Sequence, residues 1–590
     1  MNNVFEMKES LDFAISGAER EIADKSVQMA LNAGASAVMV SLDKAKTEIY
    51  ALLDGEIDNI RQTGDRSLTF NIYADGKYGT FSTNRFEEDS LRDFLCKAVE
   101  TVRMLVADPF RGLPDKKDLA TDAVNGDEMG LCWYGYDSVS RDEKLEMARR
   151  VSVFGEFSAP SSERNWRVVS EEVEYNNTLS DTYLTSSDGC RCRQTETSFE
   201  VSCQVTVEDN EGNKYSGLWW DYGVSPEKVL SSECGRKAVE MAVMQIAPVN
   251  ADKGKYTMVV SRLVSGRLLQ PVLNALSSLS VYQKSSFLVD ALGKQVFSKG
   301  LNVVDMPLEK GKSGAILFET DGRASRNREI ITDGVVKENF TSIYMSRKLG
   351  IPPTSSCPNR PVLQPFVSEE LLGGERGGGH CGVSGAGLGA ASGDGRGVEF
   401  SAVSGDELGA VSGDGLGAAS GGERGAELGA VNGSGLGGDC GDVFGAVSGG
   451  ERGVELGVAS GDERGVELCV VNGGGRGTEL VGGLGAERGL KADLFVNEIA
   501  ERDILDLCGS GILVTDFNGG NCNSATGDFS YGVSGFLFEN GKITSPIDSM
   551  LITGNMTDLW SNLLAAGSDP IPGMSRQVPT LAFRDVTFNA

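Results

Sequence analysis

Residues 511–535 read Gly511-Ile-Leu-Val-Thr-Asp-Phe-Asn-Gly-Gly-Asn-Cys-Asn-Ser-Ala-Thr-Gly-Asp-Phe-Ser-Tyr-Gly-Val-Ser-Gly535. An apolar run leads into a Gly-Gly-Asn turn, and a second strand pattern begins near Thr526 and ends among further glycines. Glycines so close to aromatic residues mark bulges, or places where another backbone comes near. The segment therefore predicts two strands joined by a turn, with a glycine-rich end that leaves room for a second chain.

Upstream of this segment, helices alternate with strand meanders. One meander runs from Thr47 to Thr83 and a second from Trp166 to Trp220, and the first has turns at Asp54-Gly55 and Asp75-Gly76. The order helix, meander, helix, meander predicts an α+β domain built from two related halves. Apolar spacing predicts helices over Glu19–Ala33, Asp89–Val106, Arg141–Phe154, Pro226–Ala247 and Leu263–Leu279, and a buried strand over Tyr256–Val260.

The composition changes sharply near residue 370 and recovers near residue 490. Residues 371–490 hold 41 of the 77 glycines, and Ser-Gly or Asn-Gly steps recur there at multiples of four residues. Ordering so much glycine is costly and few aromatic side chains are present to offset the cost, so we expect a disordered insertion. The expected divisions are an N-terminal α+β domain at 1–224, a β-rich C-terminal domain at 225–365 and 491–590, and the insertion at 366–490.

Charge and histidine content exclude several classes of function. The chain of 590 residues carries a net charge of −29 and a single histidine, His380. A strongly negative field repels nucleic acids and anionic membranes, so neither is an expected partner. One histidine inside the insertion cannot assemble a Ser-His-Asp or Cys-His site, nor a zinc site with several histidines. No secretory signal is visible and the twelve cysteines are scattered, which indicates a cytoplasmic protein.

The segment at 511–535 resembles the TldD/PmbA family, the "modulator of DNA gyrase" peptidases. The stretches Asp75–Asn84, Ser286–Phe297, Asp321-Gly322, Ile547–Asn555 and Pro579–Leu581 resemble other motifs of the family. The resemblance covers nearly everything outside 366–490, and within the family the chain is more similar to the PmbA (TldE) branch. It implies an α+β N-terminal half, a β-rich C-terminal half, and a heterodimer in which TldD carries zinc and cleaves small or unfolded peptides.

In TldD, as the resemblance implies, the zinc ligands come from an H-E-x-x-x-H helix and a late cysteine. Such a set leaves one position open for water and provides a glutamate as base. The corresponding stretch here, Ser265 to Ser286, contains no His, Glu, Asp or Cys, and the late segment Gly567 to Pro579 contains no cysteine. No catalytic or metal-ligating residue can therefore be carried over, and we expect any zinc to lie in the partner subunit.

The leading hypothesis is a non-catalytic subunit that pairs with a TldD-like zinc peptidase and binds unfolded peptides. The expected mode is strand addition at an exposed sheet edge, at Gly519, Gly520, Asn521, Gly527, Asp528, Ser530 and Gly532. One alternative is a homodimer that binds peptides or gyrase without catalysis. Another is an independent enzyme with Cys522 as nucleophile, whose base would be Asp516, Asp528 or a lysine.

Overall fold

The computed structural model describes residues 11–120, 129–373 and 499–589, together with seven short strands between 387 and 472. Contacts divide the chain into two compact units. The first comprises Met1–Leu372 and Glu498–Ala590, and the second comprises Gly373–Asn497. No helix among the described residues is long and apolar enough to cross a membrane.

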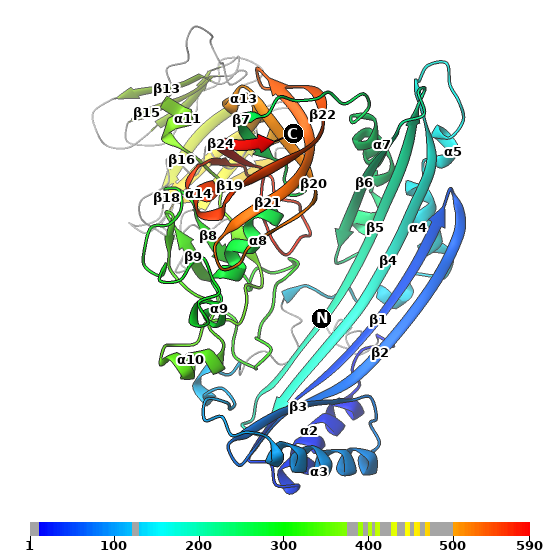
Figure 1. The fold of residues 1–590 in the computed structure, drawn as a ribbon, viewed down its shortest axis with the longest axis vertical. Helices are drawn as coiled ribbons and strands as arrows, with labels where there is room; N and C mark the ends of the chain where they lie inside the picture. The colour runs from blue at the N-terminus through cyan, green and yellow to red at the C-terminus, as the bar shows by residue number, and fades with distance from the viewer. Residues whose placement is uncertain are drawn as a thin grey trace. The chain divides into compact units, whose positions relative to one another are not determined.

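A six-stranded antiparallel sheet dominates the N-terminal half of the first unit (Figure 1). Its order, β3-β2-β1-β4-β5-β6, places two three-stranded meanders side by side, as two related halves would be. The central pair, β1 and β4, stays in register from Met39↔Ser186 to Leu53↔Glu172. The strands are β1 (Ala37–Leu53), β2 (Glu56–Ala74), β3 (Lys77–Thr83), β4 (Trp166–Ser186), β5 (Arg191–Asp209) and β6 (Lys214–Gly223).

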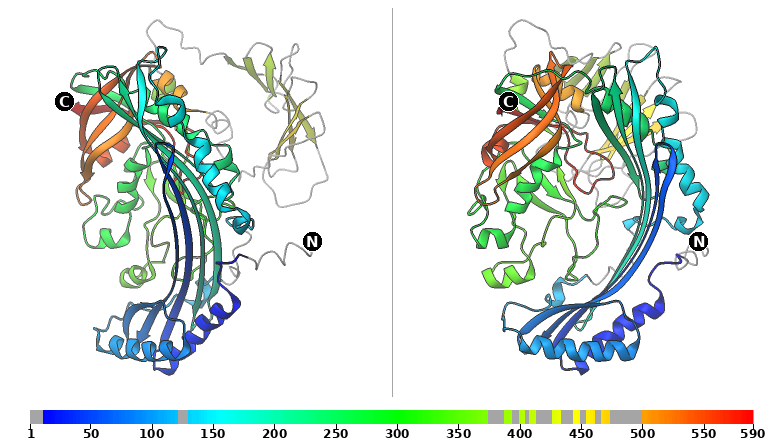
Figure 2. Two further views of the ribbon diagram at one scale, coloured as in Figure 1. Left: turned by 90° about the vertical axis from the view of Figure 1, so that its right-hand side faces the viewer. Right: turned by 45° about the vertical axis from the view of Figure 1, so that its right-hand side comes forward.

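Helices cover one face of this sheet (Figure 2). Side chains alternate between the faces of a strand, so Leu42 and Tyr50 on β1 both point into the helix-covered core. The other face carries polar side chains, such as Asp43 bonded to Thr182. The covering helices are α2 (Gly17–Asn32), α3 (Glu88–Met104), α4 (Arg141–Val151), α5 (Phe154–Phe157), α6 (Glu227–Leu230) and α7 (Cys234–Val243).

The C-terminal half of the first unit is built on a seven-stranded sheet of order β12-β23-β24-β22-β21-β20-β7. Because β7 pairs both with β20 and with β24, five of these strands close into a ring. The strands are β7 (Gly254–Val260), β12 (Phe366–Val367), β20 (Gly511–Cys522), β21 (Asp528–Glu539), β22 (Lys542–Asn555), β23 (Leu563–Ala566) and β24 (Leu581–Asn589).

The largest apolar core lies between this sheet and α8, whose buried side chains include Leu268, Leu269 and Leu273. A four-stranded sheet of order β10-β9-β8-β11 adds Val303 and Ile331 to the same core. Its strands are β8 (Val303–Asp305), β9 (Arg328–Thr332), β10 (Val335–Val336) and β11 (Pro361–Leu363). The remaining helices are α8 (Gly266–Ala275), α9 (Ser278–Tyr282), α10 (Ile343–Leu349), α11 (Glu369–Gly373), α13 (Glu501–Cys508) and α14 (Met556–Ser561).

Within the second unit, the described strands form one three-stranded and one four-stranded sheet. Equivalent positions of the repeat pair with each other, as Gly389 does with Gly409 and Gly429 with Gly457. The prediction of disorder for 366–490 falls largely on residues outside those described, and so does His380. The strands are β13 (Gly387–Ser392), β14 (Glu399–Val403), β15 (Glu407–Ser412), β16 (Ala426–Asn432), β17 (Val443–Ser448), β18 (Val454–Ser460) and β19 (Val466–Asn472).

The α+β fold class expected from the sequence is confirmed. The domain limits stay a prediction, although Phe366 and Val367, which the sequence assigned to the insertion, form β12 and pair with Ala566 and Ala565. Three expected helices are interrupted. The one over Arg141–Phe154 ends at Val151, and a separate short helix, α5, begins at Phe154. The one over Leu263–Leu279 breaks after Ala275 because the Ser278 amide donates to the Phe340 carbonyl.

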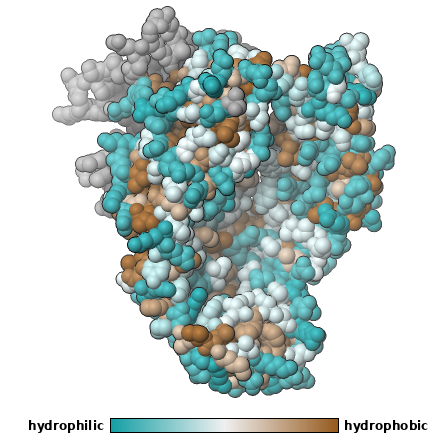
Figure 3. Space-filling model, in the orientation of Figure 1, coloured by the Kyte–Doolittle hydropathy of each residue, from teal (hydrophilic) through white to brown (hydrophobic). Residues whose placement is uncertain are grey.

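The helix expected from Pro226 breaks between α6 and α7. There the Ser232 hydroxyl bonds Asp221 and also accepts from the Cys234 amide, which starts a new helix. Exposed apolar side chains are scattered among polar ones over the face drawn in Figure 3. They give no single apolar band there.

Candidate functional site

The seven residues predicted to bind peptide all lie at one end of the hairpin formed by β20 and β21. Register pairs Gly519 with Gly532 and Asn521 with Ser530, and it places Gly520 opposite Tyr531. The pairing slips between Val514 and Asp516 and again between Phe517 and Gly519, as expected for β-bulges. Gly519, Gly520 and Asn521 lie on β20. The expectation of an exposed edge is wrong for Asp528, Ser530 and Gly532, because their strand, β21, pairs with β20 on one side and with β22 on the other. Gly527 is buried just before that strand.

The outer edge of β20 carries no strand for most of its length. β7 pairs with it only from Ile512 to Val514. From Thr515 to Cys522, none of the strands in the described residues lies on that side. Asp516, Asn518, Gly520 and Asn521 are exposed along this stretch. An unpaired edge presents backbone N–H and C=O groups to which an extended chain can bond.

One side chain reaches this edge. Arg267, an exposed residue of α8, donates from Nη1 to the carbonyl of Phe517 at 2.8 Å. Its guanidinium also lies 5.7 Å from the centre of the Phe517 ring. The Phe517 amide also has a partner, because it donates to Asp516 Oδ1 at 2.8 Å.

Packing explains two of the site glycines without any ligand. A Cβ at Gly520 would lie 2.0 Å from the Ser530 carbonyl oxygen, so no larger residue fits there. A Cβ at Gly527 would meet the Phe287 ring and the Asn555 amide, and its φ is +81°. Gly519 differs, because its φ is +145° but nothing lies within 4 Å of an added Cβ. At that position the space beside the strand is open.

Asp528 holds the tip of the hairpin in place. Its carboxylate accepts from the Thr526 hydroxyl at 2.7 Å and from the Asn555 amide at 3.0 Å. The bond from Asn555, followed by the bond from Thr526, lowers the pKa of Asp528 below its usual range. The Phe287 amide donates to the Ser524 carbonyl and fixes the tip from a second side. Gly527 and Asp528 thus shape the hairpin.

Cys522 lies in surroundings that disfavour a thiolate. Burial, followed by the nearby charge of Asp528, raises its pKa. Burial likewise raises the pKa of Tyr531 to about 12. A nucleophilic cysteine needs the opposite environment, with cationic or amide groups that lower its pKa. The alternative of a Cys522 enzyme therefore gains no support from these contacts.

The zinc site implied for TldD does not fit the side chains present here. Neither α8 nor α9 contains a His, Cys, Asp or Glu residue. No three such side chains come together at metal-binding distance anywhere in the described part of the chain. The inward side of α8 is instead apolar and packs into the core. The chemistry available at the hairpin is therefore binding through backbone and amide groups.

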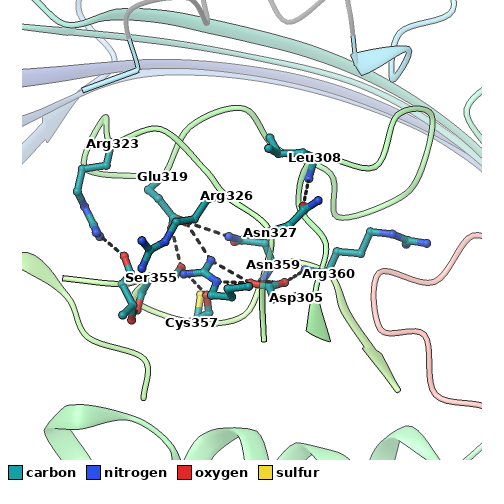
Figure 4. Close-up of polar contacts among 12 residues, drawn as sticks. Asp305, Leu308, Glu319, Arg323, Arg326, Asn327, Ser355, Cys357, Asn359 and Arg360 are labelled. Atoms are coloured by element: carbon teal, nitrogen blue, oxygen red, sulfur yellow. Dashed lines mark hydrogen bonds and ion pairs between the residues drawn. The ribbon is translucent and has the colours of Figure 1, made fainter. Parts of the chain in front are cut away.

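Sequence reasoning missed a buried polar cluster that includes Asp305, Glu319, Ser355 and Asn359 (Figure 4). Arg328 also belongs to it, because its guanidinium donates to Asp305 and to Glu319. Asp305 is fully buried and pairs with Arg328 at 2.9 Å. It also accepts from the Asn359 and Arg360 amides. Because these residues are spread over 55 positions, no local motif could reveal them. The cluster joins β8 and β9 to the loops that precede β9 and β11.

Glu319 is the member of this cluster that favours a proton. Burial raises its pKa. The Ser355 hydroxyl lies 2.7 Å from Glu319 Oε2 and 2.6 Å from the Cys357 carbonyl oxygen. The Ser355 hydroxyl donates to Glu319, and this bond, followed by the charge of Arg328, opposes the effect of burial on the pKa without cancelling it.

Comparison with known proteins identifies the family. The model of the PmbA/TldA metallopeptidase C-terminal domain matches residues 253–367 and 493–590, and that of the central domain matches 134–246. Together they cover more than half of the chain, which belongs to the PmbA/TldD family and is a metallopeptidase-like protein. Within the family it lies in the PmbA branch.

Named relatives and solved structures agree with this assignment. Metalloprotease PmbA of Escherichia coli O157:H7 is 22% identical over 558 residues, which span 94% of this chain and 92% of that protein. A Metalloprotease TldD homolog of Haemophilus influenzae is 20% identical over 230 residues, which span 37% of this chain and 46% of that protein.

Among solved structures, a protein of Bacteroides thetaiotaomicron described as a candidate modulator of DNA gyrase is 25% identical. It aligns with a TM-score of 0.71 over 98% of this chain and 100% of that one. TldE from Thermococcus kodakarensis is 12% identical, with a TM-score of 0.61 over 96% of this chain and 100% of that one, and shares the fold.

Proposed function

We propose that this chain is the peptide-holding subunit of a two-chain zinc peptidase. It would bind small or unfolded peptides, and its partner, a TldD-like chain, would carry the zinc and the cleaving residues. The observation that carries the proposal is the open outer edge of β20 from Thr515 to Cys522, next to the uncrowded Gly519. We place this activity in the cytoplasm.

Strand addition suits such a substrate. An extended peptide can bond to the free N–H and C=O groups of an edge strand whatever its sequence, whereas a folded protein cannot reach them. The open space at Gly519 allows close approach of a second backbone, and exposed Asn521 offers an amide group beside it. The Asn518 amide already donates to the Ser534 and Ser549 hydroxyls. Selection would then depend on whether the substrate is unfolded, with little reading of its side chains.

The need for a partner follows from the side chains on α8 and α9, which cannot hold zinc. Relatives named as TldD homologues match parts of this chain, so a related chain with zinc ligands is a reasonable partner. The competing possibility is a homodimer that binds peptides or gyrase and supports no cleavage. The two differ in whether an added TldD-like chain gains activity.

The decisive experiment measures cleavage of an unstructured peptide in the presence of zinc by three samples: this chain, a TldD-like chain with H-E-x-x-x-H, and the mixture. We expect cleavage in the mixture to exceed that of the TldD-like chain alone. Equal rates of cleavage by the mixture and by the TldD-like chain alone would contradict the proposal. Chelator-sensitive cleavage by this chain alone would contradict the inference drawn from its missing ligands.

A variant pair locates the binding edge. Gly519→Ala adds a methyl group into the space that the peptide would occupy. We expect this change to raise the KM of the mixture for the peptide several-fold. Gly76→Ala is the matched control, because Gly76 also has a positive φ (+71°) and no atom within 4 Å of an added Cβ, but lies in the turn between β2 and β3. Equal increases in KM for the two variants would show that the β20 edge does not bind the peptide.

A further inference from the structure

Two buried thiols meet where β5 begins. The sulfurs of Cys190 and Cys192 lie 3.5 Å apart, and both residues are almost fully buried, at 3% and 0% exposure. The C-x-C spacing by itself favours a structural role, because redox pairs usually have two residues between the cysteines. The folded chain nevertheless brings the two sulfurs into contact.

The local backbone explains this contact. Residues i and i+2 of an extended chain point to the same face, with Cα atoms about 6.6 Å apart. That separation is within reach of a disulfide, for which Cα atoms lie about 4.4 to 6.8 Å apart. Cys190 follows the turn that joins β4 to β5, in which Gly189 is exposed and has a φ of +93°. The pair therefore sits behind a hairpin turn at the surface.

Each thiol also contacts a loop from another part of the chain. Cys192 donates to the Ala120 carbonyl at 3.3 Å, and Cys190 donates to the Gly322 carbonyl at 3.8 Å. A Cβ at Gly322 would lie 2.8 Å from the Cys190 sulfur, so this loop rests directly on the thiol. The Ala120 amide in turn donates to the Gly322 carbonyl at 2.9 Å. The two loops meet over the pair.

We propose that Cys190 and Cys192 form a reversible dithiol–disulfide pair that exchanges with low-molecular-weight disulfides such as glutathione disulfide. The Cys190 thiolate attacks one sulfur of glutathione disulfide and releases one glutathione thiolate. Cys192 gives its proton to this glutathione thiolate and its sulfur attacks the Cys190 sulfur, which releases the second glutathione as a thiolate. That thiolate takes up from water the proton that Cys190 had lost. The two protein thiols are oxidised to one S–S bond, and one glutathione disulfide is reduced to two thiols.

The electrostatics support the order of attack. The contact between the two sulfurs lowers the pKa of Cys190 and raises the pKa of Cys192. A thiol with a lowered pKa is the better attacking group, as in other dithiol pairs. Because both sulfurs are buried, glutathione disulfide can reach them only when the β4–β5 turn opens. The rate of thiol–disulfide exchange therefore measures how often the turn opens.

Oxidation would alter the contact between the sheet and the two loops. An S–S bond is about 2 Å long, so at least one sulfur moves away from its carbonyl acceptor. The Cys192 bond to Ala120 also disappears with its proton. We therefore expect faster amide exchange at Ala120, whose amide bonds Gly322, and at Ala324, whose amide bonds the Asp118 carbonyl.

The test equilibrates the full chain under native conditions in glutathione buffers of increasing oxidised fraction. Acid quenching, alkylation and mass spectrometry of the peptide that contains both cysteines then follow. We expect this peptide to lose two hydrogens and to take up no alkyl group, in a single step that glutathione reverses. Exposed Cys96 and Cys357 are the positive control, because they can form only mixed disulfides with glutathione when they react.

Cys203 and Cys234 are the negative control. They are buried, and burial raises the pKa of both, so they should stay alkylatable throughout. Cys192→Ser should convert the intramolecular disulfide into a glutathione adduct on Cys190. The proposal is overturned if Cys190 and Cys192 stay reduced while Cys96 and Cys357 react. It is also overturned if they oxidise only together with Cys203 and Cys234, which would indicate global unfolding.

Discussion

Arg267 and Phe517 join a helix to the open edge of a strand. The guanidinium on α8 donates to the Phe517 carbonyl of β20 at 2.8 Å. The bond takes up a backbone acceptor at the edge where we propose that peptides bind, so it makes the arginine a competitor for the peptide. Removing the arginine side chain should change two separate quantities, the stability of the hairpin and the affinity of the edge for a peptide.

We expect Arg267→Ala to lower the free energy of unfolding by about 1 kcal/mol, which is typical of one lost hydrogen bond. The freed carbonyl should raise the affinity for an unstructured peptide a few-fold, as measured by fluorescence anisotropy. Arg262→Ala is the control, since Arg262 makes a comparable bond to the Asp569 carbonyl at 3.2 Å. An affinity gain in both variants would argue against a specific effect at the β20 edge.

Gly520→Ala should destabilise the chain far more than Gly519→Ala. The added Cβ at Gly520 would overlap the Ser530 carbonyl, which the sheet cannot move aside, and we expect a loss of about 2 to 3 kcal/mol. At Gly519 the open space leaves only backbone strain, of about 1 kcal/mol. Urea unfolding measures both losses. Similar values would mean that β20 and β21 do not pair as described.

Glu319 should make stability depend on pH. Its pKa is raised in the folded chain, so the protonated form favours folding, and this contribution is complete below the unfolded-state pKa. It is lost as the pH rises through the folded-state pKa. Glu319→Gln cannot ionise, so its unfolding free energy should fall less than that of the parent as the pH rises from the unfolded-state pKa of Glu319 through its folded-state pKa.

Glu329→Gln provides the comparison for this measurement, because Glu329 is exposed on the same strand, β9. Its unfolding free energy should follow the parent curve. Parallel curves for the parent and Glu319→Gln would show that the cluster holds Glu319 ionised. Chemical unfolding at several pH values distinguishes these outcomes.

Replacing residues 374–497 with a short Gly-Ser linker should leave the first unit folded. The chain is fastened on both sides of this segment, by the Ser368 amide to the Leu564 carbonyl and by the Ser568 amide to the Ile499 carbonyl. Both ends of the segment are therefore bonded to residues 564–568, so a short linker can join them. Shortening the loop should change stability only slightly, because loop length affects stability weakly. Circular dichroism melting checks this expectation, and loss of the cooperative transition would refute it.

The sequence predicted elements whose signals are local. Alternating apolar residues and Asp-Gly turns revealed the meanders. The turn expected at Gly-Gly-Asn was placed too early, because these residues belong to β20, which runs to Cys522, and the chain turns at residues 523–527. Tertiary contacts decided the rest. The amide of Ser278 ends α8 by bonding Phe340, and Asp305 meets Arg360 across 55 positions. At the candidate site, the glycines of the sequence indicated where a hairpin could form. The sequence could not show that Arg267 bonds the Phe517 carbonyl at the edge of β20.

The pairing of β7 with β24 sets the order in which the molecule can be made. Val260 pairs with Leu581, 321 positions later, so the C-terminal ring cannot close until the last strand has left the ribosome. Translation of that interval takes on the order of tens of seconds. The N-terminal sheet pairs strands that are mostly consecutive and can form earlier. During the delay the apolar side chains of β7 and α8 lack their partners, and every residue of the glycine-rich segment lengthens their exposure to chaperones and proteases.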